Sequence, residues 1–209
     1  MNITHQVIPV TLQETTLCSL FDDGQRVLGQ NAINRSSLVG RPFRLRLVPA
    51  VELNADARAA IMGADKIVIN PGDLYTSIIP NFLVDGIREA LSQAHATVIY
   101  VANLMTINGH TDGLSVVDHQ KILAEYMHPK GIDCVIYNTA IPDETLFHAY
   151  TSQNQHPVIL GDQDAAPGIR FIGEDLIDSK VYEKRRGDTL QRSFIRHNAD
   201  KLARILYEL

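Results

Sequence analysis

Three continuous apolar runs, each followed by a helical pattern, constrain the fold of this chain more than any other feature. The runs are KIVIN at 66–70, TVIYVAN at 97–103 and IDCVIYN at 132–138. A strand that is apolar at nearly every position is buried on both faces, as in a parallel sheet covered by helices on each side. The repeated order of strand and helix requires crossover connections. We therefore predict an α/β fold in which these three runs are adjacent parallel strands.

The first 50 residues have a different pattern. The stretches 6–12, 15–21, 25–33 and 43–49 are short and either rich in β-branched residues or alternating, and a turn signal at 22–24 separates the second from the third. No linker or low-complexity segment follows them. We predict one domain over 1–209, with a β-rich segment at 1–50 and an α/β core at 51–209.

Helical spacing and further apolar runs predict the rest of the core. Apolar residues recur at helical spacing between 77 and 94, which predicts one amphipathic helix with Pro80 in its first turn. The other predicted helices are 54–64, 115–127, 143–153 and 196–209, and the other predicted strands are 156–160, 170–177 and 179–184.

Charge and composition argue against several classes of protein. The formal net charge is −5 and the one basic cluster is 184–186, so nucleic acid and membrane surfaces have little electrostatic support as partners. No apolar stretch reaches the roughly 18 residues of a membrane span, and the N-terminus lacks the features of a signal peptide. Cys18 and Cys134 lie in separate apolar runs and are expected to be buried free thiols. This cysteine usage favours a cytoplasmic protein.

A polar loop separates the first apolar run from the helix after it. Gly72 permits close approach of a ligand to the backbone, and the hydroxyls of Thr76 and Ser77 lie where the helix is predicted to begin. The free amides of a first helical turn attract anions, so one interpretation is a phosphate site. Asp73 would repel a phosphate and would instead cap a turn, hold a cation or bond a ribose hydroxyl. The other interpretation is an ordinary turn with a helix cap, and the local sequence leaves both open.

A longer polar loop follows the second apolar run. It contains Asn103, Thr106 and Asp112, and it ends at Ser115 and Asp118, which have the spacing of a capping box. Long loops at the carboxyl edge of a parallel sheet are common places for ligands. We expect this loop and the first one to meet at the same edge.

A metal site is the alternative interpretation of the longer loop. Its ligands would be His110, Asp112 and His119. Their spacing matches none of the compact metal-binding motifs, so we predict no metal there.

The last helix begins with two side chains of interest, Arg196 and His197, ahead of a predicted cap at Asn198. One interpretation is a plain surface helix start. The other is an arginine delivered to the mouth of a phosphate site. No pattern of nucleophile, histidine and acid can be identified from spacing, so the sequence names no catalytic residue.

Taken together, three long motifs resemble a known family. They are NPGDLYTSIIPNFLVDGIREAL at 70–91, VIYVANLMTINGHTDGLSVVDH at 98–119 and RHNADKLARIL at 196–206. They are similar to motifs of the CofD-like superfamily and most closely to its YvcK branch. The resemblance extends from about residue 6 to the end of the chain.

The resemblance implies a Rossmann-like three-layer α/β sandwich with a mainly parallel sheet. It also implies one of two activities. CofD itself transfers a phospholactyl group, whereas the YvcK branch binds UDP-sugars and is associated with central carbon metabolism and cell-wall homeostasis. Family members begin with a glycine-rich loop that this sequence does not contain, so the chain is expected to correspond to the C-terminal two-thirds of the family fold.

Three positions depart from the family motifs. Asn70 stands where the family has glycine, Asp73 where it has serine, and Asn198 where it has aspartate. An acid at Asp73 argues against unaided phosphate binding. The change at Asn198 keeps a helix cap and removes a charge.

We therefore predict a nucleotide-sugar binding protein, expected to be a homodimer. Phosphate would contact Thr76, Ser77 and the backbone of Gly72, with charge from Arg196, and Asn103, Thr106 and Asp112 would bond sugar or base. The full set of predicted ligand contacts is Asn70, Gly72, Asp73, Tyr75, Thr76, Ser77, Asn103, Thr106, Asp112 and Arg196. One alternative is a CofD-type transferase of a phosphorus-containing group, with Mg²⁺ as its cofactor. The other is a truncated fragment that binds nothing.

Overall fold

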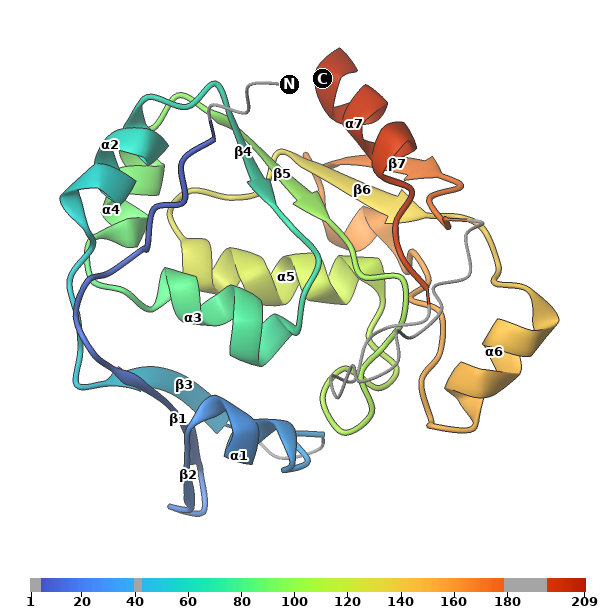
Figure 1. Cartoon of the computed structure of the whole chain (residues 1–209), viewed down its shortest axis with the longest axis horizontal. Coiled ribbons are helices and arrows are strands. Elements are labelled where there is room, and N and C mark those ends of the chain that lie inside the picture. Colours follow the sequence, from blue (N-terminus) through green and yellow to red (C-terminus); the bar gives the residue numbers. More distant parts are fainter. Residues whose placement is uncertain (1–4, 40–42, 179–194) are drawn as a thin grey trace.

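The main sheet of the protein is fully parallel. The structure is a computed structural model that describes residues 5–39, 43–178 and 195–209. Four strands lie in the order β4-β5-β6-β7, and every neighbouring pair is parallel (Figure 1). They are β4 (Lys66–Ile69), β5 (Thr97–Val101), β6 (Cys134–Asn138) and β7 (Arg170–Glu174). The predicted adjacency of the three apolar runs is confirmed.

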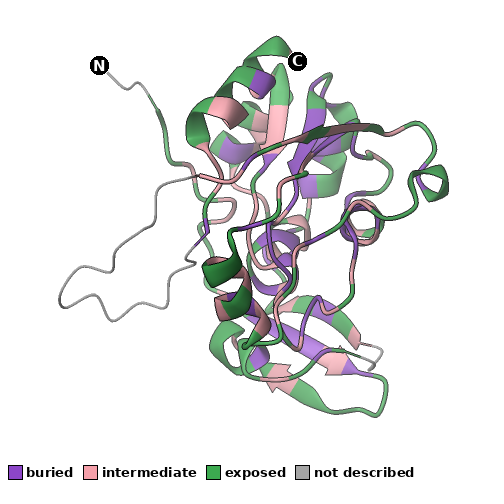
Figure 2. Cartoon of the chain, turned by 90° about the vertical axis from the view of Figure 1, so that its right-hand side faces the viewer, coloured by how far each residue is buried: buried purple, intermediate pink, exposed green. Residues whose placement is uncertain are grey.

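Helices cover both faces of this sheet and so make three layers. Val98 and Tyr100 of β5 point into a core shared with α4 and α5, whereas Ile99 and Val101 point into a second core shared with α6 and α7. The side chains of a strand alternate between its faces, which explains why β5 is apolar at consecutive positions. These helices are α4 (Ile87–Gln93), α5 (Val116–Met127), α6 (Glu144–Thr151) and α7 (Ala199–Glu208). Figure 2 shows the buried residues gathered in the strands and on the inner sides of the helices.

The β-rich segment forms a separate antiparallel sheet with the order β2-β1-β3. Its strands are β1 (Thr16–Phe21), β2 (Arg26–Leu28) and β3 (Phe43–Val48), and α1 (Gln30–Asn34) lies against them. Its buried side chains, among them Phe21 and Leu45, join the same hydrophobic cluster as Tyr100 of the main sheet. The two sheets are therefore connected through one continuous core.

The predicted single helix over 77–94 is wrong. The segment contains η1 (Leu74–Ile78), a turn of π-helix, then α3 (Ile79–Phe82), and only after a break α4. Pro80 lies in the first turn of α3, as expected. The break occurs at Gly86, whose φ of 91° belongs to the left-handed region that glycine adopts without strain. A short helix α2 (Ala55–Met62), capped by Asn54 as predicted, contacts α4.

Some of the predicted strands differ from the structure. Residues 6–12 and 156–160 are not strands, and 25–33 divides into β2 and α1. The fourth place in the main sheet is taken by β7 instead of 156–160. The predicted strand 179–184 lies outside the described residues. No helix in the described ranges has the length and apolarity needed to cross a membrane.

Candidate functional site

A pocket of about 570 Å³ lies at the carboxyl edge of β4 and β5, and we call it the edge pocket. Four segments surround it: the loop after β4, the first part of the loop after β5, the end of α6 with the turn that follows, and the residues that lead into α7. Parallel strands end together at this edge, so loops that are distant in sequence meet there. The residues that line it are Pro71, Gly72, Asp73, Asn103, Leu104, Met105, Thr106, Ile107, Tyr150, Gln155, Ile195, Arg196 and His197.

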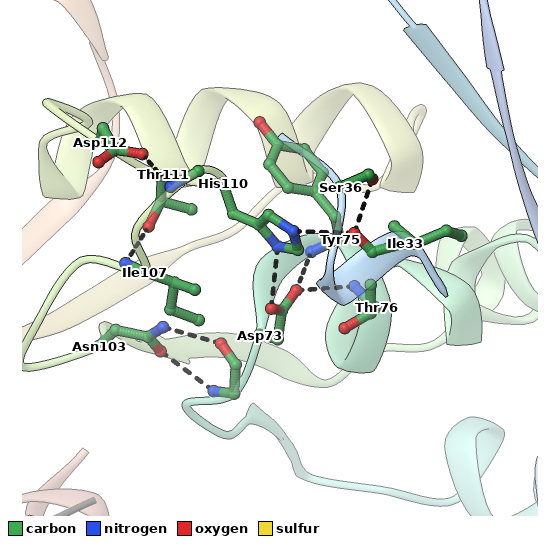
Figure 3. Close-up of polar contacts among 12 residues, drawn as sticks. Ile33, Ser36, Asp73, Tyr75, Thr76, Asn103, Ile107, His110, Thr111 and Asp112 are labelled. Carbon is green, nitrogen blue, oxygen red and sulfur yellow. Dashed lines mark hydrogen bonds and ion pairs between the residues drawn. The ribbon is translucent and has the colours of Figure 1, made fainter. Parts of the chain in front are cut away.

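Asp73 caps the first helical turn after β4. Its Oδ1 accepts hydrogen bonds from the amides of Tyr75 at 3.0 Å and Thr76 at 2.9 Å (Figure 3). Its backbone carbonyl accepts from the amides of Ser77 and Ile78. Four amides that could have faced an anion are thus bound within the protein.

The second oxygen of Asp73 contacts His110 from the loop after β5. Oδ2 lies 3.1 Å from Nδ1 of His110, and Nε2 of the same ring lies 3.2 Å from the carbonyl oxygen of Ile33 in α1. Both acceptors lack a proton to give, so both ring nitrogens must donate, which requires the imidazolium form. The pair is buried, with 1% of the His110 side chain and 15% of the Asp73 side chain exposed.

The ionisation of this pair is set by a balance between burial and partners. Desolvation by itself raises the pKa of Asp73, but the hydrogen bonds from His110 and Thr76 and the charge of His110 lower it below its usual value. For His110 desolvation lowers the pKa, and the hydrogen bond and charge of Asp73 raise it above its usual value. The charge that made Asp73 unsuited to a phosphate site is therefore matched by a neighbouring cation.

Asn103 joins the two loops. Its Oδ1 accepts from the amide of Gly72 at 3.0 Å, and its Nδ2 donates to the carbonyl of Gly72 at 2.8 Å (Figure 3). This reciprocal pair fixes the backbone of the first loop against the end of β5. It also means that the Gly72 amide already has an acceptor.

The loop after β5 is held by its own side chains. Thr111 Oγ1 accepts from the amide of Ile107 at 2.8 Å, and Asp112 Oδ2 accepts from the amide of Gly109 at 2.6 Å. The other oxygen of Asp112 accepts from Asn154 at 3.0 Å, so the acid holds this loop to the turn after α6. Asp112 does not line the edge pocket.

The amides at the start of α5 are also bound within the protein. The predicted capping box is confirmed, since Ser115 Oγ accepts from the Asp118 amide and Asp118 Oδ2 accepts from the Ser115 amide. The next amides, of Val116 and Val117, donate to carbonyls of the segment 159–160. Residues 156–160 were predicted to be a strand of the sheet, but the carbonyls of 159–160 instead accept hydrogen bonds from the first amides of α5.

Four other predicted contacts lie away from the lining of the edge pocket. Tyr75 packs its ring on Phe43 of β3 with 5.1 Å between centroids, and burial raises its pKa to about 12. Thr76 is buried, and its hydroxyl has no hydrogen-bond partner among the described residues. Asn70 and Ser77 are exposed. Their role as ligand contacts, like that of Asp112, stays a prediction.

Arg196 and His197 reach the pocket because the chain before α7 pairs with the segment that follows β7. The amide of Asp178 donates to the carbonyl of Arg196, and His197 forms a bridge with Ile177. Arg196 is exposed and lines the edge pocket, and its role in binding phosphate stays a prediction.

His197 is a pocket residue that sequence reasoning did not commit to. Its Nε2 donates to the carbonyl of Ala102 at the end of β5 at 3.1 Å, and burial lowers its pKa. The ring is thus neutral near pH 7, and its Nδ1 is an acceptor. The sequence signal was its place beside Arg196, but nothing in the sequence alone indicated that its ring would bond to the carbonyl of Ala102.

The described residues contain no group of three or more histidine, cysteine or acidic side chains that could hold a metal. His110 binds Asp73, Asp112 holds its own loop, and Nδ1 of His119 donates to the carbonyl of Ser115. Within the described part of the chain the metal alternative for this loop therefore finds no support, and Asp73 is the one acid in the described lining of the edge pocket.

Comparison with known proteins identifies relatives over nearly the whole chain. The family model described as 2-phospho-L-lactate transferase CofD matches residues 1–177. A putative gluconeogenesis factor of Thermotoga maritima is 38% identical over 207 residues, which cover 98% of this chain and 62% of that protein. One of a Nostoc strain is 35% identical over 204 residues, which cover 96% of this chain and 42% of that protein.

A solved structure agrees with this match. The crystal structure of a UPF0052 family member from Bacillus halodurans superposes with a TM-score of 0.81 at 30% identity. The match covers 96% of this chain and 60% of that one. The chain thus spans about two-fifths to three-fifths of the length of these relatives.

Proposed function

The chain belongs to the CofD family, and from that premise we propose that the edge pocket binds a nucleotide sugar, with UDP-sugars as the ligand class. Within this proposal the protein regulates central carbon metabolism and cell-wall homeostasis in the cytoplasm. The name gluconeogenesis factor, carried by relatives such as that of Bacillus subtilis, supports the metabolic role.

The observation that carries the proposal is the placement of Arg196 on the wall of a pocket whose acid is already neutralised. Asp73 has its charge paired by His110 and both of its oxygens occupied by hydrogen bonds. A diphosphate in the pocket would meet a guanidinium group, which binds phosphate oxygens in a bidentate fashion. The pocket volume of about 570 Å³ lies within the range of small-molecule sites.

Polar groups beside Arg196 suit the sugar or base of such a ligand. Thr106 Oγ1 accepts a hydrogen bond from the amide of His156, so its own hydrogen can donate to a ligand oxygen. Nδ1 of His197 can accept from a hydroxyl. The amides of residues 75–78 are bound within the protein, so in this proposal the side chain of Arg196 recognises the phosphate.

Thermal melting tests this proposal with UDP-glucose, GDP and uridine, each with and without Mg²⁺. Ligand at about a hundred times its dissociation constant adds roughly 2.7 kcal/mol of apparent stability, a rise of several degrees in a domain of this size. We expect UDP-glucose to raise the melting temperature without Mg²⁺ and uridine to have little effect, because only the former carries phosphates.

The matched variants are Arg196→Gln and Arg204→Gln. Both remove one positive charge, but Arg204 is an exposed residue of α7 that does not line the pocket. Arg196→Gln should weaken UDP-glucose binding by about tenfold or more, since a charge-assisted hydrogen bond is lost. Equal affinity in the two variants, or no shift of the wild type with UDP-glucose, would overturn the proposal.

The second candidate is a CofD-type transferase, favoured by the description of the matching family. Such an activity is associated with Mg²⁺, whose ligands are oxygen atoms. The donors in the edge pocket do not fit that ion, because its one lining acid, Asp73, is held by His110 and two amides. A melting shift with GDP that needs Mg²⁺ and is absent with UDP-glucose would favour this second function.

A further inference from the structure

A second pocket, of about 580 Å³, lies between the two sheets, and we call it the lateral pocket. It is bounded by β3, by the chain between α3 and α4, and by the last turns of α5. These elements are brought together by direct contacts of α3 with β3 and with α5 (Figure 1). Its lining residues, none shared with the edge pocket, are Arg44, Phe82, Leu83, Arg88, Glu125 and Tyr126.

The apolar part of the lateral pocket belongs to the main hydrophobic core. Phe82, Leu83 and Tyr126 are half-buried and pack against the buried cluster that joins both sheets. Tyr126 comes from the last turn of α5, and burial raises the pKa of its hydroxyl. These three side chains therefore present a fixed apolar surface to the pocket.

Two arginines from different elements line the same pocket. Arg44 comes from β3, and Arg88 comes from the first turn of α4. Neither guanidinium group makes an ion pair or hydrogen bond with another described residue, whereas Arg58 lies 3.9 Å from Glu89 and Lys201 lies 2.9 Å from Asp175. Two cations without an ionic partner among the described residues, beside an apolar surface, form a place where an anion with an apolar body is complementary in both charge and shape.

We propose that the lateral pocket binds a small organic anion, a phosphate or carboxylate joined to an aromatic or aliphatic body. The anionic group lies between Arg44 and Arg88, and the apolar body covers Phe82, Leu83 and Tyr126. Glu125, also in the lining, leaves the three charged side chains with a net charge of +1. Its carboxylate weakens the attraction of the two arginines for the anion and accepts a hydrogen bond from any donor on the ligand.

The probe is 1-naphthyl phosphate, compared with 1-naphthol, which lacks the anion, and with inorganic phosphate, which lacks the apolar body. The chain contains no tryptophan, so the fluorescence of the naphthyl group can be followed without interference from indole. We expect saturable binding of 1-naphthyl phosphate to be at least about tenfold tighter than that of either fragment, a difference of about 1.4 kcal/mol.

Matched variants locate the binding. Arg44→Gln and Arg46→Gln remove the same charge from exposed positions two residues apart on β3, and Arg46 does not line the pocket. Arg44→Gln and Arg88→Gln should each weaken the probe by about tenfold, while Arg46→Gln should change it by less than about twofold. Glu125→Gln should act in the opposite direction and tighten binding, because it removes a repelling charge. Circular dichroism and melting confirm that the variants fold.

Arg196→Gln separates this proposal from the one for the edge pocket. If the probe enters the edge pocket, Arg196→Gln weakens it and Arg44→Gln does not, which overturns the lateral site. Equal affinity in the Arg44 and Arg46 variants, equal affinity for 1-naphthol and 1-naphthyl phosphate, or an absence of saturable binding would each overturn it as well.

Discussion

Two loops meet at the carboxyl edge of the main sheet, and different interactions hold each of them in place. The short loop after β4 contains one acid, Asp73, whose oxygens cap a helical turn and contact a histidine of the other loop. The long loop after β5 is held mainly by its own groups, with Asp112 bonded to the Gly109 amide and Thr111 to the Ile107 amide. Asp112 also accepts from Asn154 in the turn after α6. The short loop thus depends on the long one, through both His110 and Asn103.

This difference explains how the amides of residues 75–78 and of residues 115–118 are bound within the protein. In the short loop a charged side chain takes the amides, and the buried charge then requires a counter-ion. At the start of α5 the hydroxyl of Ser115 and the carbonyls of 159–160 accept from the amides of the helix, and the carboxylate of Asp118 accepts only from the amide and hydroxyl of Ser115. We therefore expect an anion bound at this edge to contact side chains such as Arg196. We also expect the paired acid of the short loop to contribute more to the free energy of unfolding than the acid of the long loop.

The largest expected effect comes from removing the two acids in turn. Asp73→Ala deletes a helix cap and leaves the buried cation of His110 without its partner, for a loss of about 3 kcal/mol in the free energy of unfolding. Asp112→Ala removes hydrogen bonds at a partly exposed site and should cost about 1 kcal/mol. Urea denaturation of both variants measures the difference. Equal losses would show that the two loops do not differ in this way.

Asp73→Asn separates the cap from the charge. An asparagine oxygen can still accept from the Tyr75 and Thr76 amides, so this variant should keep the cap and lose only the ion pair. We expect its stability to fall between those of the wild type and Asp73→Ala. A variant as stable as the wild type would assign the whole effect to the cap.

A smaller effect is expected where the long loop meets the segment that closes α5. Gly161 has a φ of 83°, and a Cβ there would lie 2.7 Å from the Cβ of Ser115 and closer still to its hydroxyl oxygen. Gly161→Ala should therefore combine backbone strain with displacement of the Ser115 cap, at a cost of about 2 kcal/mol. Gly113→Ala is the control, because its φ of 71° gives the strain while its Cβ would meet nothing within 4 Å.

Gly113→Ala should cost about 1 kcal/mol on backbone grounds alone. Its difference from Gly161→Ala in urea denaturation then measures how much the stability depends on the cap of α5. If the two variants unfold alike, the close approach of Gly161 to Ser115 has no energetic weight, and the closure of α5 would not be a feature that distinguishes the two loops.

The sequence predicted those features of this edge that depend on local interactions. The apolar runs predicted the sheet because burial on both faces leaves its mark on every residue of a strand. The capping box of Ser115 and Asp118 was predictable because both partners lie within one turn. The break before α4 also has a local signal, the Asp85-Gly86 pair. The helical spacing of the apolar residues on both sides of this pair nevertheless led to the prediction of one continuous helix.

The interactions that determine the site are non-local, and the sequence did not predict them. Asp73 and His110 are 37 residues apart, and Nε2 of His197 reaches a carbonyl 95 residues away. The segment 156–160 has the composition of a strand, but its backbone bonds to Thr106 and Leu104 instead of to the sheet. Local patterns identify which residues are apolar or polar, whereas the choice of partner depends on the completed fold.

The smallest expected effect concerns pH, and it compares two histidines of the same loop and helix. His110 has a pKa raised by Asp73, so its contribution to stability is complete below the unfolded value of 6.5 and is lost as pH rises through the folded value. His119 is buried and has a lowered pKa, so protonation of the unfolded chain makes the protein less stable as pH falls below 6.5. The two side chains should therefore give pH dependences of opposite sign.

Urea denaturation between pH 5 and pH 9 tests this with His110→Gln and His119→Gln. The difference in unfolding free energy between wild type and His110→Gln should shrink as pH rises, and the difference for His119→Gln should shrink as pH falls. Asp73, whose pKa is lowered from 3.8, and Tyr75, whose pKa is raised to about 12, both face His110 and keep their charge state across this range. If both variants followed the wild type in parallel, His110 would not be the counter-ion on which the short loop depends, and the order of the two loops would have to come from Asn103 and backbone hydrogen bonds.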